Sequence, residues 1–277
     1  MPELIVHGAV VVPVALLVGL VLGALGGGGS ILTVPALVYL LGQEPGAATT
    51  GSLVIVGTTA LIGAVPHRRA GRVRLGQGVV FGVLGVGGAY LGSRLSVSVD
   101  PNLLLATFAV LMLVVAALMT RRRRAAREGE VGSVAPVRGR APVGLRPARC
   151  DCRGVLVLVA AATGVGLLTG FFGVGGGFAV VPALVLALRL PMPVAVGTSL
   201  VVIAINSASA LVSRLGQQVE LDWAVIGTFT AIAVVGSLLG ARLASRVRPA
   251  RLEVAFTVLL VVVAVYTAVR SVPALVP

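Results

Sequence analysis

Polar and charged residues along this chain fall in short clusters that separate long apolar stretches. Eight of these stretches approach or reach the roughly 20 residues that a helix needs to cross about 30 Å of hydrocarbon. They cover residues 5–25, 47–66, 75–95, 103–119, 154–172, 194–212, 224–243 and 252–269. Two shorter apolar pieces, residues 31–41 and 178–188, each follow a run of glycines. The pattern predicts an all-α protein, a polytopic bundle of transmembrane helices.

The apolar pattern occurs twice. The stretch GLVLGALGGGGSILTVPALVYLLG at 19–42 corresponds to GLLTGFFGVGGGFAVVPALVLALR at 166–189, with a constant offset of 147 positions (182 − 35 for the shared proline). A second block, GAYLGSRL at 88–95, matches GSLLGARL at 236–243 with an offset of 148 (236 − 88). We therefore expect two homologous transmembrane repeats, residues 1–120 and 154–277, joined by an Arg-rich cytoplasmic linker, residues 121–153.

Composition agrees with a membrane protein, because 57% of the residues are hydrophobic and only 11% are charged, against about a quarter charged in soluble domains. A formal net charge of +13 is also typical of proteins that bind nucleic acid. However, the basic residues are all Arg, and most gather in short clusters at 67–74, 121–153 and 242–251, as in cytoplasmic loops. No nucleic acid is therefore expected as a partner. The N-terminal apolar segment lacks a basic n-region, so it is expected to be retained rather than cleaved.

Charge also indicates how the repeats face the membrane. The loop around Arg72 in the first repeat is basic, whereas its counterpart, residues 214–222, carries Glu220 and Asp222. The next pair of equivalent loops shows the opposite contrast. The charges around Asp100 in the first repeat are balanced, whereas the loop around Arg248 in the second repeat is basic. Equivalent loops are thus predicted to lie on opposite sides, which makes the repeats inverted. The inversion requires that each short piece after the glycines is either a crossing or a re-entrant return, giving eight to ten segments.

The two glycine runs, residues 23–30 and 170–177, are the strongest candidates for a binding site. Several glycines within one turn should break a helix, and unwound backbone at membrane depth is tolerated only inside protein or along a cavity. Each break frees amides at the positive end of the next half-helix, which can bind an anion. The candidates are Gly28, Gly29, Ser30, Gly175, Gly176 and Gly177. The alternative is that the runs only allow close helix packing, the role we expect for Gly82, Gly85, Gly87 and Gly88.

Duplicated hydroxyl positions add a second set of candidates. Ser52 and Ser199 occupy equivalent places in TTGS and VGTS. Their hydroxyls can cap the next helix or donate to a ligand oxygen. Thr59 aligns with Asn206 further along the same segments, and an Asn within the membrane is costly unless it forms a hydrogen bond. We predict that all four bind substrate, although a neighbouring helix is the simpler partner for Asn206.

Several kinds of chemistry are disfavoured. The nine acidic residues lie outside the apolar segments or at their ends, so no carboxylate is placed to bind a cation at the midplane. His7 and His67 form no cluster, and no phosphate-binding loop with a Lys is present. Cys150 and Cys152 are expected to be incidental reduced cysteines in the cytosolic linker. We therefore expect no enzyme activity, no metal and no cofactor.

The paired G-x-x-G-x-G-G-G blocks followed by V-P-A-L, and then the TGS and GTS turns, resemble the sulfite exporter TauE/SafE family, also called the four-toluene-sulfonate-uptake permeases. The resemblance covers both halves and implies a multi-pass secondary transporter of the bacterial inner membrane. Its substrate would be a small sulfur-containing or organic anion such as sulfite, a sulfonate or sulfoacetate. The alternative function is an anion channel. The expected partners are this anion and the lipid bilayer, and a homodimer is left open.

Overall fold

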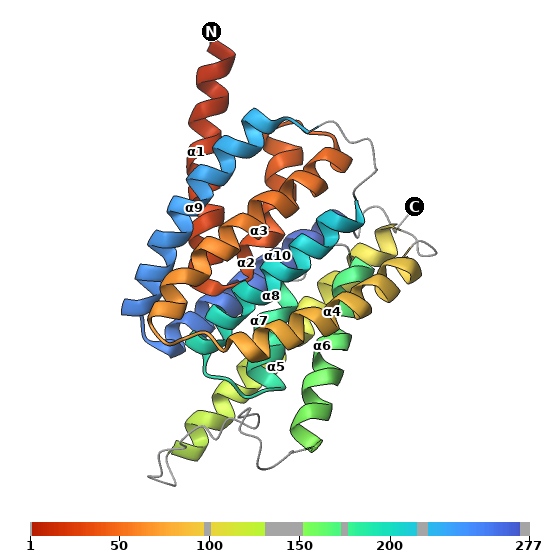
Figure 1. Ribbon diagram of the computed structural model, residues 1–277, viewed down its shortest axis with the longest axis vertical. Helices are drawn as coiled ribbons and strands as arrows, with labels where there is room; N and C mark the ends of the chain where they lie inside the picture. Colours follow the sequence, from red (N-terminus) through yellow and green to blue (C-terminus); the bar gives the residue numbers. More distant parts are fainter. Residues whose placement is uncertain (1, 97–100, 131–151, 173–176, 215–220, 272–277) are drawn as a thin grey trace.

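The computed structural model describes residues 2–96, 101–130, 152–172, 177–214 and 221–271 (Figure 1). Across these residues the chain forms ten α-helices and one short π-helix, with no strand, so the all-α prediction is confirmed there. The first half contains α1 (Pro2–Leu25), α2 (Gly28–Pro35), the π-helix η1 (Ala36–Leu40), α3 (Pro45–Arg69), α4 (Leu75–Ser96) and α5 (Pro101–Glu130). The second half contains α6 (Cys152–Phe172), α7 (Gly177–Leu186), α8 (Met192–Ser213), α9 (Trp223–Arg246) and α10 (Pro249–Ser271).

The predicted apolar stretches correspond to these helices. Five described helices have a segment long and apolar enough to cross a membrane: Gly46–Arg69, Leu75–Gly92, Met192–Ser213, Trp223–Arg246 and Pro249–Ala268. Four shorter apolar helical segments accompany them: Val11–Leu25, Gly28–Val38, Val155–Phe171 and Gly177–Leu186. Helices predominate because each backbone amide and carbonyl must find its partner within the chain when water is absent. Many Leu and Val side chains on α4, α9 and α10 are exposed, as contact with lipid requires.

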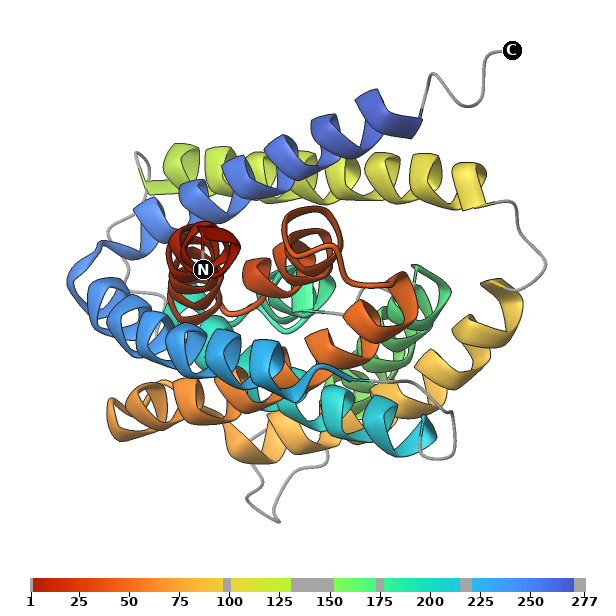
Figure 2. The ribbon, with the colours of Figure 1, turned by 90° about the horizontal axis from the view of Figure 1, so that it is seen from above.

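Helices from the two halves pack in matched pairs. α1 packs along α9 and α4 along α6, while α3 packs against α8, α5 against α10 and α2 against α7. Figure 2 shows α5 and α10 side by side along one edge of the molecule. Because α6 is the counterpart of α1, and α9 that of α4, the α1–α9 and α4–α6 contacts are equivalent. Each half therefore meets the other through the same surfaces.

Glycines let the backbones in these pairs touch. A Cβ atom placed on Gly23 of α1 would lie 2.1 Å from the carbonyl oxygen of Ser237, and one on Gly170 would lie 1.9 Å from that of Ala89. The first glycine of each run thus packs helices together, as the alternative interpretation of the runs proposed.

The four glycines of α4 expected to serve packing differ in their surroundings. A Cβ on Gly88 would lie 2.3 Å from the Thr163 carbonyl oxygen, and one on Gly82 would crowd Ile205 at 3.0 Å. Gly85 contributes its backbone to the contact with Gly166. A Cβ on Gly87 would meet nothing within 4 Å, so the packing prediction is wrong for Gly87.

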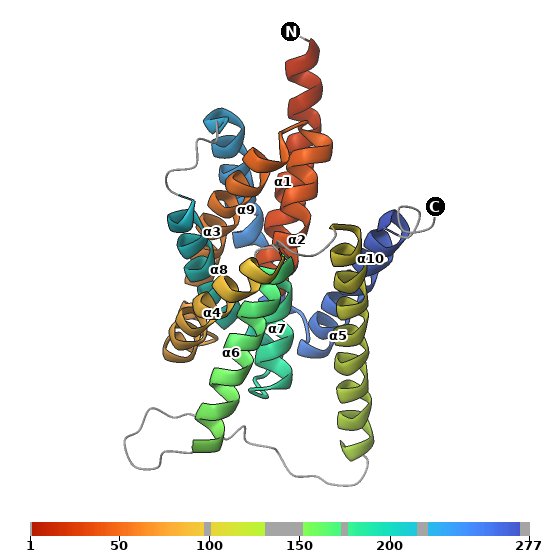
Figure 3. The same ribbon diagram turned by 90° about the vertical axis from the view of Figure 1, so that its right-hand side faces the viewer.

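The counterpart helices α1 and α6 run in opposite directions. In Figure 3, α1 descends from the N-terminus at the top, while α6 rises from the bottom. α2 and α7, with eight and ten residues, follow them near the middle of the molecule. At 1.5 Å per residue these helices are about 12 and 15 Å long, roughly half of a 30 Å hydrocarbon layer. The π-helix η1 continues α2 without a gap, so the helical stretch after the first break spans residues 28–40.

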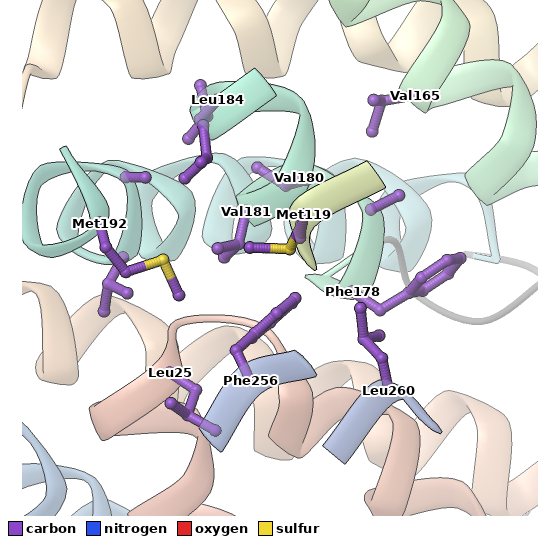
Figure 4. Packing of buried hydrophobic residues seen from close by; sticks show 14 of the residues in the cluster. Leu25, Met119, Val165, Phe178, Val180, Val181, Leu184, Met192, Phe256 and Leu260 are labelled. Carbon is purple, nitrogen blue, oxygen red and sulfur yellow. The ribbon is translucent and has the colours of Figure 1, made fainter. Parts of the chain in front are cut away.

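Apolar packing holds α7 in the centre of the molecule. Phe178 and Leu184 of α7 are fully buried, and Figure 4 shows this helix among Met119 of α5 and Phe256 of α10. The rings of Phe108 and Phe178 pack edge to face with centroids 4.9 Å apart. Arg122 of α5 donates to the carbonyl oxygen of Val185 in the last turn of α7. This helix therefore has a fixed position from which its first turn faces the first repeat.

Candidate functional site

The first glycine run separates α1 from α2. α1 ends at Leu25 and α2 begins at Gly28, with Gly27 as the residue before its first turn. Gly26 has a φ of +76°, a backbone conformation that glycine adopts much more readily than other residues. Its amide donates to the Leu22 carbonyl oxygen at 2.8 Å and so closes the end of α1. The first amides of α2 have no acceptor within their own helix, as at any helix N-terminus.

The second break meets the first. α6 ends at Phe172 and α7 begins at Gly177; the predicted site residues Gly175 and Gly176 lie outside the described residues. A Cβ atom placed on Gly27 would lie 1.9 Å from the carbonyl oxygen of Gly177, and one on Gly177 would lie 2.5 Å from the Ser30 hydroxyl oxygen. The N-terminal ends of α2 and α7 are therefore in direct backbone contact. We call this contact, formed by Gly26, Gly27, Ser30, Gly177 and Ser199, the break junction.

Ser199 of α8 ties the second repeat to the first break. Its hydroxyl is fully buried and lies 2.8 Å from the carbonyl oxygens of both Gly26 and Val196, to which it can donate. Ser30 donates to the Gly27 carbonyl oxygen at 2.8 Å. The sequence therefore placed Ser30, Gly177 and Ser199 in one candidate site, and the structure brings these three together.

Ser52 forms its hydrogen bond within its own helix and not with the break junction. Its hydroxyl donates to the Thr49 carbonyl oxygen within α3 at 2.8 Å. The capping alternative is wrong for both serines, because α3 and α8 begin at Pro45 and Met192, well before Ser52 and Ser199. The residues that do precede these helices make no side-chain capping bond.

Gly28 and Gly29 lie in the first turn of α2, with different neighbours. A Cβ on Gly28 would approach the end of the Leu259 side chain at 2.2 Å, which a flexible side chain can relieve by moving. A Cβ on Gly29 would instead meet the Val18 carbonyl oxygen at 2.6 Å. Gly29 is therefore the more constrained of the two positions.

Three polar side chains without a hydrogen-bond partner lie along α3 and α8. They are Thr59 Oγ1, Asn206 Oδ1 and Ser207 Oγ, each with its oxygen atom buried. A Cβ on Gly57 would lie 2.9 Å from Ser207 Cβ, which places this part of α8 against α3. A Cβ on Gly85 would lie 3.7 Å from Asn206 Oδ1, so Gly85 also borders a predicted site residue. Buried polar atoms without partners are uncommon and mark places where a ligand or water can bind.

The sequence did not single out His67 as part of this region. Its ring is buried near the end of α3, and Nε2 lies 2.9 Å from the carbonyl oxygen of Gly23. Because a carbonyl oxygen only accepts, Nε2 must carry the hydrogen. The bond satisfies one of the last carbonyls of α1, which lose their helical partners where the helix stops. The sequence offered one signal for His67, which is its place in the repeat. At the 147-residue offset His67 corresponds to Arg214 (214 − 67), so both repeats have a basic residue type at this position.

No acidic side chain among the described residues is hydrogen-bonded to a residue of the break junction. Three acidic residues have described side chains: Glu44 and Asp222 are exposed at helix ends, and Glu253 is half-buried in the first turns of α10. Asp222 accepts from the amides of Ala224 and Val225. Within the described residues no group of three or more His, Cys, Asp or Glu could hold a metal ion. The junction offers backbone amides, carbonyls and hydroxyls, which bind by hydrogen bonding and dipole orientation.

Comparison with known proteins identifies the family. The profile of the sulfite exporter TauE/SafE family matches residues 11–267. A probable membrane transporter protein of Xylella fastidiosa strain 9a5c is 34% identical over 259 residues, covering 92% of each chain. The probable membrane transporter protein YunE of Bacillus subtilis is 25% identical over 263 residues, covering 92% of this chain and 94% of its own. No solved structure matches the chain.

These matches run through both halves and agree with the helices long and apolar enough to span a membrane. They point to a multi-pass protein of the inner membrane that acts as a transporter rather than an enzyme. The chain belongs to the sulfite exporter TauE/SafE family of membrane transporters.

Proposed function

We propose that this family member is a secondary transporter of a small sulfur-containing or organic anion, such as sulfite, a sulfonate or sulfoacetate, and that the anion binds at the break junction. The observation that carries the proposal is the contact between the N-terminal ends of α2 and α7 at Gly27 and Gly177. Each helix N-terminus is equivalent to about half a positive charge. Two such ends meet here, and no described carboxylate is hydrogen-bonded to either of them.

The chemistry of the junction suits an oxyanion. Sulfite and sulfonate groups present three oxygens that accept hydrogen bonds, and the first-turn amides of α2 and α7 supply donors without a formal cation. Ser30 and Ser199 donate to backbone carbonyls in this structure. In the proposed bound state these hydroxyls rotate toward the anion, while Gly28, Gly29 and Gly175–Gly177 supply amides. Thr59, Ser52 and Asn206 are proposed to contact the anion along its path between α3 and α8.

Inverted repeats would provide the movement. The opposite directions of α1 and α6 and the equivalent helix pairs support a two-fold relation between the halves. In Figure 1 the α3–α4 and α9–α10 connections, which carry Arg72 and Arg248, lie at the same lower-left end. We propose that this end is cytoplasmic and that the loop with Glu220 is external. Cysteine labelling should modify positions 72 and 220 from opposite faces; labelling of both from one face would contradict the inversion.

The packing at the break junction favours a carrier over the channel alternative. Gly27 and Gly177 touch through their backbones, so an anion bound between them must separate the two halves before it can pass. A carrier couples such a separation to each transport cycle, whereas a channel holds a continuous path open. Separation of the halves also explains why each repeat contributes one half-helix to the same junction.

Counterflow in proteoliposomes tests the proposal. Vesicles preloaded with unlabelled anion should accumulate the labelled anion transiently against its gradient, and the initial rate should saturate. The panel is sulfite, thiosulfate, a sulfonate and sulfoacetate, with an organic cation of similar size as the control. Linear, non-saturating flux without counterflow would support a channel, and no flux of any anion would refute the anion proposal.

A further inference from the structure

An arginine lies between α3 and α8 at the end of this helix pair that is away from the break junction. Arg214 follows the last residue of α8, and its Nη1 donates to the hydroxyl oxygens of Thr49 and Thr50 at 3.0 and 2.9 Å. Both hydroxyls donate their own hydrogen to the Gly46 carbonyl oxygen, at 3.0 Å each. The threonines therefore act toward Arg214 only as acceptors, and they fix its guanidinium against the first turns of α3.

This arrangement leaves most of the guanidinium unused. Arg carries five N–H donors, and the two threonines engage only Nη1. No carboxylate among the described residues pairs with Arg214, and Nε and Nη2 form the edge that binds an oxyanion with two parallel hydrogen bonds. The N-terminal end of α3 lies beside the same group and adds positive potential.

The Arg214 end of the α3–α8 pair differs from the opposite end of the pair, which is its counterpart in the repeat. The equivalent of Arg214 is His67, which is buried and bonded to the Gly23 carbonyl oxygen. The backbone of Arg72 covers that end, since a Cβ on Gly197 would lie 2.5 Å from the Arg72 carbonyl oxygen. Arg214 is instead only partly buried, and a Cβ on the neighbouring Gly46 would meet nothing within 4 Å. One end of the α3–α8 pair is closed by backbone. The other leaves the Arg214 guanidinium partly exposed beside α3, and the exposed Glu44 that precedes α3 forms no ion pair with it.

We propose that Arg214, held by Thr49 and Thr50, forms a capture site for an oxyanion at the accessible end of α3 and α8. The site rests on the proposed anion transport and adds a first binding step before the anion reaches Asn206 and the break junction. The same chemistry would recognise the phosphate of an anionic lipid headgroup. The experiment must therefore distinguish a solute anion from a lipid.

The test measures local charge and anion binding without relying on transport. Gly46→Cys supplies a single cysteine for labelling in the full chain, after Cys150→Ser and Cys152→Ser. It is labelled in vesicles by a negative and by a positive methanethiosulfonate reagent of similar size. Arg214→Gln should lower the ratio of negative to positive labelling rates about tenfold, from the loss of one charge a few ångströms away. Arg214→Lys should keep the ratio, because it keeps the charge.

An added sulfonate, which does not react with the labelling reagent, should slow negative labelling in the Arg214 protein, less in Arg214→Lys and not in Arg214→Gln. Protection by solute in phosphatidylcholine vesicles identifies the solute as the occupant. Protection that needs phosphatidylglycerol and ignores the solute identifies a lipid headgroup and overturns the capture role. An unchanged rate ratio in Arg214→Gln, or no protection by any anion, would refute the site. Labelling remains readable if counterflow fails, so the two proposals can fail separately.

Discussion

Replacement of Gly27 by Ala is the perturbation that most directly probes the break junction. The added Cβ would lie 1.9 Å from the Gly177 carbonyl oxygen, whereas a tolerated C···O contact is about 3.3 Å. The ends of α2 and α7 must therefore move apart by roughly 1.4 Å, which we expect to destabilise the protein by about 1–3 kcal/mol.

The same shift should weaken anion binding. An N–H···O bond of about 2.9 Å that lengthens by that amount no longer counts as a hydrogen bond. Two charge-assisted bonds lost in this way correspond to about 3 kcal/mol, or a rise in half-saturation of roughly 100-fold. Counterflow in proteoliposomes measures the half-saturation, and thermal unfolding of the purified protein measures the stability.

Gly87→Ala in α4 is the matched control, because its Cβ would meet nothing within 4 Å. We expect wild-type transport and a stability that is unchanged or up to about 1 kcal/mol higher, from better helix propensity. If Gly27→Ala transports with wild-type half-saturation and stability, the two breaks do not meet as described. If Gly87→Ala loses transport to the same extent, the effect is not specific to the junction.

The remaining predictions use single side chains. Ser199→Ala should destabilise the protein by about 1–2 kcal/mol, because it leaves the buried Gly26 carbonyl without this donor. Ser52→Ala should change stability by less than about 0.5 kcal/mol, because the bond of Ser52 lies within α3. Equal effects in thermal unfolding would contradict the distinction. Arg189 has a φ of +51°, so Arg189→Gly should stabilise the protein by about 1 kcal/mol; a lower midpoint would argue against that conformation.

The sequence predicted the helices well because membrane-spanning segments carry a strong local signal. An apolar stretch of about 20 residues must form a helix in lipid, and the duplicated glycine runs gave the positions where α1 and α6 end. The pairing of helices was not predictable in this way. It depends on which glycine faces which backbone. The contacts of Gly23 with Ser237 and of Gly170 with Ala89 cannot be predicted from local composition.

The candidate site was predictable only in part. Ser30, Gly177 and Ser199 were proposed because duplication marked them, and the structure places them together. That they bind substrate stays a prediction. The partners of their hydroxyls could not be foreseen, since a serine can donate to its own helix, to another segment or to a ligand. Arg214 was not singled out from the sequence, because the residues that hold its guanidinium, Thr49 and Thr50, precede it by more than 160 positions.

The position of a bound anion is the measurement that tests the central claim most directly. Selenite is a pyramidal oxyanion like sulfite, and selenium can be located by its anomalous scattering in crystals of the protein. Provided that selenite competes with the transported anion in counterflow, we predict a selenium peak at the break junction. Its oxygens should lie about 2.7–3.2 Å from first-turn amides of α2 and α7, near Gly28 and Gly177. A competing selenite that binds only away from the junction would contradict the account.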